Sequence, residues 1–276
     1  LTLIMSTPKL PFLIVDHDIA PDGSIRNLSN IQKMGDTMRL VDEYKLFPLP
    51  IPEFNGQPTP FIHRGYLGAA TYSKFTMVEE NQPMYSNIVR SAKKMKLGTS
   101  LHEQYQYTVA LQNFPWLEQT EDEVKTRLLD LSKKGHPQAM FEYGLKLYRE
   151  QTNIEEGLYW IGLAASYGLA RAEYRLGTIL TSSPWVEYDE SKALFWLESA
   201  ADKSHIHATL KAAELKLTAQ DLTLRDIHAA VDLLGKIESS QHTNPEYFYL
   251  LALTHRYAEK RDIPEVIKNL EKAIFM

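Results

Sequence analysis

The chain has 276 residues, of which 44% are hydrophobic and 24% are charged, and its formal net charge is −5. These values are typical of a soluble protein with one large domain or two, and the acidic balance argues against a nucleic-acid-binding protein, which would show a basic field. The sequence has no Cys, which excludes disulfides and thiol nucleophiles. None of its apolar runs approaches the ~18 residues of a membrane span.

Residues 1–80 are predicted to form a small α+β module that begins with a β-hairpin. Residues 11–19 are rich in branched apolar side chains, residues 20–23 (APDG) have Pro and Gly where turns place them, and residues 24–31 alternate apolar with polar side chains. Two such runs joined by a short loop that contains Gly predict a hairpin.

A helix and a further strand are expected after the hairpin. Residues 35–47 place their apolar side chains mostly on one side of a helix, with Asp36 as its cap. Residues 49–63 contain four prolines and are predicted to be a connector, and residues 65–77 are the next strand candidate, although their alternation is poor. The expected order is therefore hairpin, helix, strand.

This N-terminal region resembles the C-terminal domain of the TonB family of energy transducers. Those domains have a strand ending in V-D-x-D-G and then F-x-P-A-x-x-N-G-x-P before a last strand. The matching residues here are Val15, Asp16, Asp22, Gly23, Phe47, Pro48, Asn55, Gly56 and Pro58. The resemblance covers about residues 11–77 and implies a module that contacts other proteins in a bacterial envelope. The alternative is a generic α+β cap on the open end of a solenoid.

From residue 81 the chain is predicted to be helical. Residues 81–96 form a helical connector whose last turn is rich in Lys, which suits the negative end of the helix dipole, and residues 97–100 break it. Residues 101–276 are predicted to form an α-solenoid. Signals for helix starts are the capping boxes Ser100 with Glu103, Thr120 with Glu123 and Thr152 with Glu155, the cap Asp189, and Pro245 and Pro264 at first helical positions.

These signals predict about five antiparallel helix pairs. Because the α-solenoid follows the small N-terminal α+β module, the chain is predicted to be α+β overall. The pairs are 101–113 with 121–134, 136–150 with 154–167, 169–182 with 189–203, 205–219 with 223–238, and 245–258 with 263–275. Five pairs exceed the roughly three that a stable repeat array needs.

Two successive pairs share a repeated pattern. Ala139 and Gly144 recur 33 residues later, and Trp160, Ala164 and Ala165 recur 36 residues later. The pattern resembles the Sel1-like repeat, a relative of the tetratricopeptide repeat, with copies at 136–168 and 169–204. The copies depart from it at Gly157, Leu158 and Ser204. The resemblance implies an α-solenoid used for protein contacts.

The recurring residues are expected to have structural roles. Ala and Gly at these positions let antiparallel helices approach closely, and Trp160 and Trp196 fill the volume between neighbouring pairs. We therefore assign them no chemistry, and a longer side chain at Gly144 or Gly177 would hold the helices apart.

No catalytic or metal site is predicted. His205 and His207 are two residues apart at a helix start and point in different directions, and strand alternation separates His17 from Asp16 and Asp18. No zinc-protease, nucleophile-elbow, P-loop or dinucleotide motif is present. We predict no enzyme activity, no cofactor and no metal.

A candidate partner-binding surface follows from the residues that do not recur. On the first helix of successive pairs, one face carries Gln138, Glu142 and Arg149, then Arg171 and Arg175, then His207 and Lys211. We call these seven residues the first-helix face, and the predicted partner-binding residues are Glu142, Arg171, Arg175, His207 and Lys211. In related arrays such helices line the concave surface. This face is locally basic and should prefer an acidic segment; the alternative is a solvated charged face without a ligand.

Three classes of function remain. The first is a protein-binding scaffold or adaptor that acts through the solenoid, and the second is a TonB-like transducer in which residues 11–77 make the functional contact. The third is an enzyme with a site between the two regions, which no motif supports. The expected location is the periplasm, with the cytoplasm as the alternative, and the sequence does not define the oligomeric state.

Overall fold

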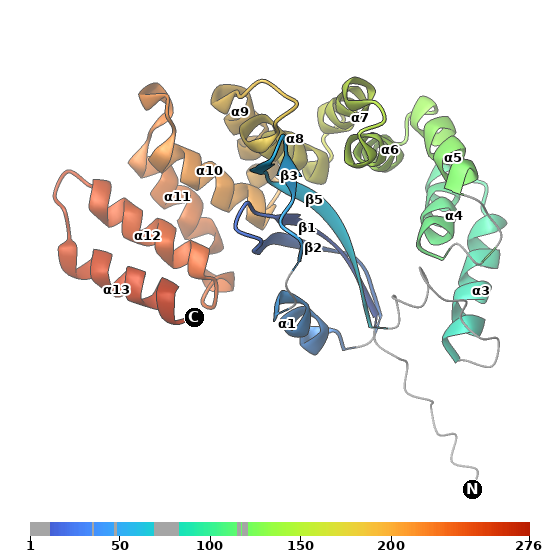
Figure 1. Cartoon of the computed structure of the whole chain (residues 1–276), viewed down its shortest axis with the longest axis horizontal. Coiled ribbons are helices and arrows are strands. Elements are labelled where there is room, and N and C mark those ends of the chain that lie inside the picture. The colour runs from blue at the N-terminus through green and yellow to red at the C-terminus, as the bar shows by residue number, and fades with distance from the viewer. Residues whose placement is uncertain (1–11, 35, 47–48, 69–82, 115–116, 118–120) are drawn as a thin grey trace, which may run out of the picture. The chain divides into compact units, whose positions relative to one another are not determined.

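The computed structural model describes residues 12–34, 36–46, 49–68, 83–114, 117 and 121–276 (Figure 1). It divides into two compact units, Leu1–Trp160 and Ile161–Met276. The boundary falls within helix α7 (Ile154–Ser166). The domain boundaries expected near residues 80 and 100 stay a prediction.

The predicted hairpin is confirmed in the first unit. Strand β1 (Phe12–Ile19) pairs antiparallel with β2 (Ile25–Met34). The turn between them closes through the N–H of Gly23, which donates to the carbonyl of Ala20 at 2.8 Å, and Gly23 has the positive φ of 82° that this turn requires. Strand β5 (Phe61–Gly68) pairs antiparallel with β1 on its other side, so the strand order is β2-β1-β5.

Helix α1 (Met38–Leu46) covers one face of this sheet. Its Leu40, Val41 and Tyr44 pack against a small core of Leu13, Val15 and Leu67. The helix lies close to β5 because Gly65 has no side chain: a Cβ there would lie 2.6 Å from the Tyr44 hydroxyl oxygen. The predicted cap is confirmed, since Asp36 Oδ1 accepts the N–H of Met38 at 3.2 Å.

The connector and the third strand differ from the expectation. Residues 49–63 contain a two-stranded ladder, β3 (Glu53–Phe54) and β4 (Gln57–Pro58), joined by Asn55 and Gly56 at positive φ. Strand β5 begins at Phe61, four residues before the predicted start at residue 65. Arg64, which directly precedes the predicted start, is buried within this strand. Residues 69–77, Phe47 and Pro48 lie outside the described residues.

The order hairpin, helix, strand is therefore confirmed. The resemblance of this region to the TonB C-terminal domain stays a prediction.

The ten paired helices are confirmed, and most bounds agree within one residue. After α3 (Pro83–Lys96), the helices are α4 (Leu101–Asn113), α5 (Glu121–Lys133), α6 (Pro137–Glu150), α7, α8 (Ala170–Ser182), α9 (Glu190–Asp202), α10 (Ile206–Thr218), α11 (Ile227–Ile237), α12 (Pro245–Tyr257) and α13 (Ile263–Phe275) (Figure 1). The capping box at Ser100 and the cap at Asp189 are confirmed.

Three of the predicted helix-start signals differ from the structure, and one of the three helices starts at another residue. Helix α11 begins at residue 227, not 223, because Asp226 caps it and accepts the N–H of Ala229 at 2.9 Å. The cap of α7 is Asn153, which accepts the N–H of Glu156 at 3.0 Å, so the box lies one residue later than expected. Pro264 occupies the second helical position behind the cap Asp262. Thr120 lies outside the described residues.

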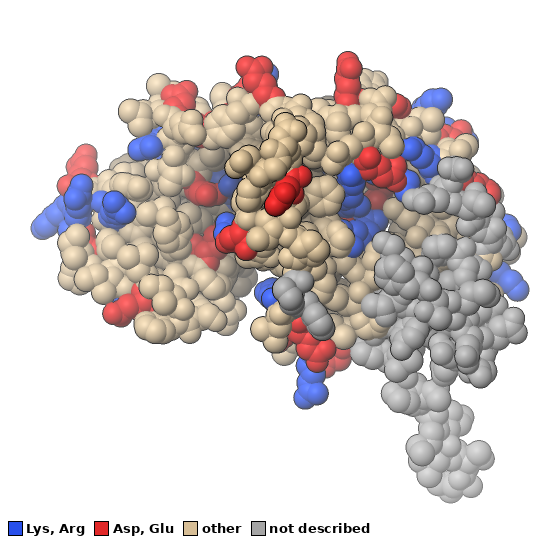
Figure 2. All heavy atoms as spheres, in the orientation of Figure 1, with Lys and Arg blue, Asp and Glu red and all other residues tan. Residues whose placement is uncertain are grey.

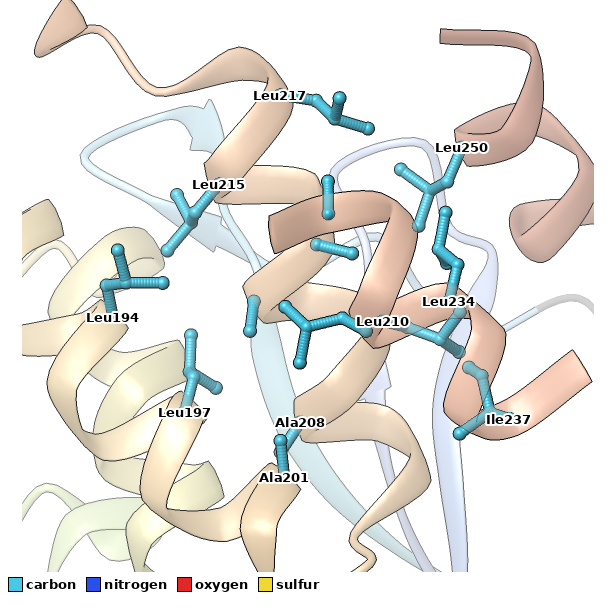
Figure 3. Packing of buried hydrophobic residues seen from close by; sticks show 14 of the residues in the cluster. Leu194, Leu197, Ala201, Ala208, Leu210, Leu215, Leu217, Leu234, Ile237 and Leu250 are labelled. Carbon is cyan, nitrogen blue, oxygen red and sulfur yellow. The ribbon is translucent and has the colours of Figure 1, made fainter. Parts of the chain in front are cut away.

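The second unit has a continuous apolar core that runs from α8 to α12 (Figure 3). Leu194 and Leu197 of α9 and Leu210 of α10 are buried there, and Ala201 and Ala208 are small enough to let the helices approach. The close approach predicted at Gly177 is confirmed: a Cβ there would lie 2.5 Å from Leu197 Cγ.

Gly157, a departure from the repeat pattern, marks the matching close approach between α6 and α7. Its Cβ would lie 2.8 Å from the carbonyl oxygen of Gly144. The departure therefore has a structural reason, because even Ala at this position would press on the neighbouring helix backbone.

Candidate functional site

Two charged side chains lie opposite each other on neighbouring strands of the sheet. Asp16 of β1 and Arg64 of β5 are register partners. Arg64 donates from Nε to Asp16 Oδ1 at 2.9 Å and from Nη2 to Oδ2 at 3.1 Å, so the pair is bidentate. Strand alternation directs both side chains to the face opposite α1, since Val15 and Gly65 lie against α1.

Helix α6 meets this pair with two charges of its own. Arg64 Nη2 donates to Glu142 Oε2 at 3.2 Å, and Arg149 Nη2 lies 2.8 Å from Asp16 Oδ1. We call Asp16, Arg64, Glu142 and Arg149 the buried charge cluster. Two carboxylates and two guanidinium groups balance, so the cluster as a whole is neutral.

The buried charge cluster is shielded from solvent, and its Arg64 guanidinium stays protonated. Asp16, Arg64 and Glu142 are exposed by only 3%, 8% and 3%. Burial alone would lower the pKa of Arg64, but the charges of Glu142 and Asp16 outweigh it and hold that pKa well above its usual value. Removing one member of such a set typically costs ~3–5 kcal/mol, because a buried charge is left unpaired.

Glu142 is therefore not open to solvent in this structure. The sequence predicted that Glu142 lies on a groove-lining surface of α6. In the structure Glu142 lies against the sheet, where its carboxylate is paired with Arg64. Sequence reasoning missed Asp16 and Arg64 as partners of the first-helix face. The available signal was Arg64 itself, a charged residue between Ile62 and Tyr66 in a strand of mostly apolar residues.

The other four predicted residues lie in the second unit, on α8 and α10. Arg175 is 4% exposed, and its guanidinium carbon lies 5.4 Å from the centre of the Tyr174 ring. The ring of His207 lies 6.1 Å from the same tyrosine. Lys211 forms an ion pair with Glu214 at 2.7 Å, one turn along α10. Arg171, His207 and Lys211 are partly exposed.

Three of these basic side chains, Arg171, Arg175 and His207, lie near His205 and affect its pKa. Burial, followed by the positive charges of His207, Arg175 and Arg171, lowers the pKa of His205 to about 4. The neutral ring has a structural role, because its Nδ1 accepts the N–H of Ala208 at 3.2 Å and so caps α10. The structure thus brings Arg171, Arg175 and His207 together around one helix start.

The same capping device occurs in the first unit. His136 Nδ1 accepts the N–H of Ala139 at 3.2 Å and caps α6. Each capping His stacks at 4.7 Å on a Tyr that precedes it by 31 residues: His136 on Tyr105, and His205 on Tyr174. Sequence reasoning missed both caps, and this spacing was the signal that could have found them.

Other buried carboxylates of the second unit are engaged in structural contacts. Glu173 pairs with Lys203 at 2.7 Å, and Glu190 accepts the N–H groups of Gln220 and Asp221, both at 3.0 Å. Burial and the hydrogen bond to Glu190 raise the pKa of Tyr188 to about 12. Both carboxylates therefore hold the fold together.

Among the residues that the structure describes, no group of three or more His, Asp or Glu side chains is placed to hold a metal ion, and no helix is both long and apolar enough to span a bilayer. Acidic and basic side chains are interspersed on the face that Figure 2 shows.

The comparisons with known proteins agree with the repeat pattern. The Sel1 repeat family matches residues 137–168 and 170–205. A Sel1 repeat protein from Oxalobacter formigenes is 22% identical over 70% of this chain and 56% of its own, with a TM-score of 0.51, which shows a shared fold. A protective antigen of uropathogenic Escherichia coli with an SLR fold is 17% identical over 75% of this chain and 44% of its own, with a TM-score of 0.48.

The chain spans about half the length of these two solved structures. Among curated proteins no sequence matches it. The two family matches coincide with helices α6 to α9, where the residues of the repeated pattern lie. Residues 137–205 therefore contain two Sel1 repeats.

Proposed function

We propose that this chain is a non-enzymatic adaptor that binds an extended, acidic segment of another protein along its first-helix face. Sel1 repeat proteins generally mediate protein–protein interactions. The observation that carries the proposal lies within the first unit, where this face already holds an extended strand. Asp16 of β1 meets Arg149 of α6 at 2.8 Å, so a carboxylate on a strand is what the face accepts there.

The following repeats place basic residues on α8 and α10 at the repeat position of Glu142. The position of Glu142 is taken by Arg175 after 33 residues and by Lys211 after a further 36. Within the second unit, a segment bound at α8 and α10 would meet the basic residues at these positions, and carboxylates are their natural partners. Arg171, His207 and Lys211 are the partly exposed contacts, while the buried Arg175 adds positive charge beneath them.

A charge-reversal experiment tests this function. The double variant Arg171→Glu with Lys211→Glu should weaken partner binding at least ~10-fold, because attraction is replaced by repulsion. The matched control reverses Lys133 and Lys236, which are exposed on second helices, and gives the same change in net charge. Partners are captured with the full chain, and their affinities are then measured with each variant. Equal capture and affinity for both double variants would contradict the proposal.

We also propose a periplasmic location, with the cytoplasm as the alternative, on the basis of the resemblance of residues 11–77 to the TonB C-terminal domain. Cell fractionation of the natively expressed protein tests it. Recovery with cytosolic marker proteins would refute the periplasmic location.

A further inference from the structure

The second half of helix α3 carries positive charges that no nearby acidic residue balances. Residues 81–102 contain one Arg and three Lys but neither Asp nor Glu, in a chain whose net charge is −5. The dipole of α3 favours cations in its last turn, but Arg90 lies before that turn. The next acidic residue is Glu103, and its carboxylate accepts the N–H and the hydroxyl of Ser100 at 3.1 and 2.9 Å in the capping box of α4. The positive charge of α3 is therefore not neutralised within this segment.

Three of these cations lie on the side of α3 that faces away from the core of the first unit. Ile88 and Ala92 form the inner side of the helix and are 8% and 5% exposed. Arg90, Lys93 and Lys94 are exposed, and their three- and four-residue spacing places them together on the outer side. Within the described part of the chain none of the three forms an ion pair, whereas lysines on α9, α10 and α13 each pair with a carboxylate one turn away. These three cations are therefore available to a binding partner.

An exposed leucine lies among these cations. Leu97 directly follows α3 and is 84% exposed, and its spacing from Lys93 and Lys94 places it on the same outer side. Its backbone is fixed, because the N–H of Leu97 donates to the carbonyl of Lys93 at 3.3 Å and the N–H of Gly98 also bonds back to α3. A structured turn therefore holds an apolar side chain in solvent among three cations. We call Arg90, Lys93, Lys94 and Leu97 the α3 patch.

The composition of the α3 patch favours a lipid surface as its partner. Lys is depleted at protein–protein interfaces, where Arg is enriched, and two of the three cations of the patch are Lys. The hydrated ammonium group of Lys acts as a point charge, which suits the diffuse negative potential of anionic headgroups, and an apolar side chain at the same surface can enter the boundary with the acyl chains. We propose that the α3 patch binds this chain peripherally to bilayers that contain anionic lipids, with Leu97 as the apolar contact. The patch shares no residue with the first-helix face, so the two proposals are tested independently.

The contribution of the charges is tested by vesicle flotation with the full chain. It should bind vesicles made of phosphatidylglycerol and phosphatidylcholine in equal parts, but not vesicles of phosphatidylcholine alone. Lys93→Gln with Lys94→Gln should weaken this binding ~30-fold, because each cation near an anionic surface contributes a factor of ~5. The matched control, Lys236→Gln with Lys260→Gln, removes the same charge at exposed positions of the second unit and should bind as the wild type does. Equal binding to both kinds of vesicle, or by both double variants, would overturn the proposal.

The role of Leu97 is tested by substitution, with the same anionic vesicles. Leu97→Ser should weaken binding ~10-fold, because a leucine side chain that leaves water contributes at least this much. The matched control is Leu222→Ser, at a leucine of the second unit that is 69% exposed, and it should have no effect. Equal binding by Leu97→Ser and by the wild type would overturn the role of Leu97 as the apolar contact.

The insertion itself is observed with a fluorescent label. The sequence has no Cys, so Leu97→Cys and Leu222→Cys each provide a single site for an environment-sensitive dye. The emission from position 97 should shift to shorter wavelength when anionic vesicles are added, whereas the emission from position 222 should not. A label at position 97 that stays in water while the protein is bound would overturn the insertion. If the wild type bound an octaglutamate peptide but no vesicles, and Lys93→Gln with Lys94→Gln abolished peptide binding, the lipid assignment would be overturned in favour of an acidic protein.

Discussion

The same substitution should have opposite effects at two glycines of the second unit. Gly177 lies in α8, where an added Cβ would sit 2.5 Å from Cγ of Leu197 and 3.3 Å from the carbonyl oxygen of Ala193. Gly235 lies in α11, and no atom comes within 4 Å of its added Cβ. Gly177→Ala therefore tests the packing between helices, and Gly235→Ala is its matched control for the change in backbone freedom.

The expected magnitudes follow from these distances. In a helix interior, Ala is more favourable than Gly by roughly 0.5–1 kcal/mol, so Gly235→Ala should stabilise the protein by about that amount. Gly177→Ala has the same gain, but Leu197 is fully buried and must shift, and overpacking of this kind typically costs ~1–3 kcal/mol. We expect a net loss of about 0.5–2 kcal/mol, which corresponds to a melting temperature lowered by roughly 2–6 °C.

The assay is urea and thermal unfolding of the full chain with each variant, followed by circular dichroism. A third variant, Gly177→Ala with Leu197→Ala, should show a smaller effect of the Gly177 change because the clashing side chain is removed. The packing argument would be refuted if Gly177→Ala stabilised the protein as much as Gly235→Ala did.

Two further predictions concern buried polar groups. The pKa of His205 is about 4 in the folded chain against 6.5 for the ordinary group, so the unfolded state binds more protons between these values, and stability should fall as the pH drops from about 6.5 to about 4. After allowance for the ring's partial exposure, the loss of unfolding free energy is about 2 kcal/mol. His205→Asn can still cap α10 without titrating, so it should remove most of the pH dependence of the unfolding free energy, measured by urea unfolding between pH 4 and 7. An unchanged pH dependence would contradict the assignment of this effect to His205. Glu190→Gln removes a buried charge that accepts two loop N–H groups and should cost ~1–3 kcal/mol in the same assay at pH 7, whereas Glu187→Gln, at an exposed position, should cost nothing measurable; equal effects would argue against the role of Glu190.

The helices could be predicted from the sequence because their signals are local. Ser100, Asp189 and Pro245 mark helix starts through atoms within three residues of the helix end, so neither distant contacts nor the other unit are needed to place them. The start of α11 was wrong for the same local reason, since Asp226 is the better cap and lies nearer to the apolar pattern.

The buried charge cluster could not be predicted in this way. Arg64 and Glu142 are 78 residues apart in the sequence, and neither carries a local signal that names the other. Glu142 takes the same repeat position as Arg175, and its partner Arg64 belongs to a sheet that lies outside the repeated pattern. The two histidine caps were missed because His is a rare cap whose function depends on its remaining neutral.

The position of the boundary between the two compact units has a practical consequence for dissecting the chain. A fragment that ended at Trp160 would cut α7 after two turns and lose Ile161, Ala164 and Ala165, which are among its most buried residues. A fragment that ended after Gly168 would keep α6 and α7 intact as a closed helix pair. Shortening or lengthening of this protein, in the laboratory or in evolution, should therefore proceed by whole repeats, because only the loops between repeats can be cut without opening a core.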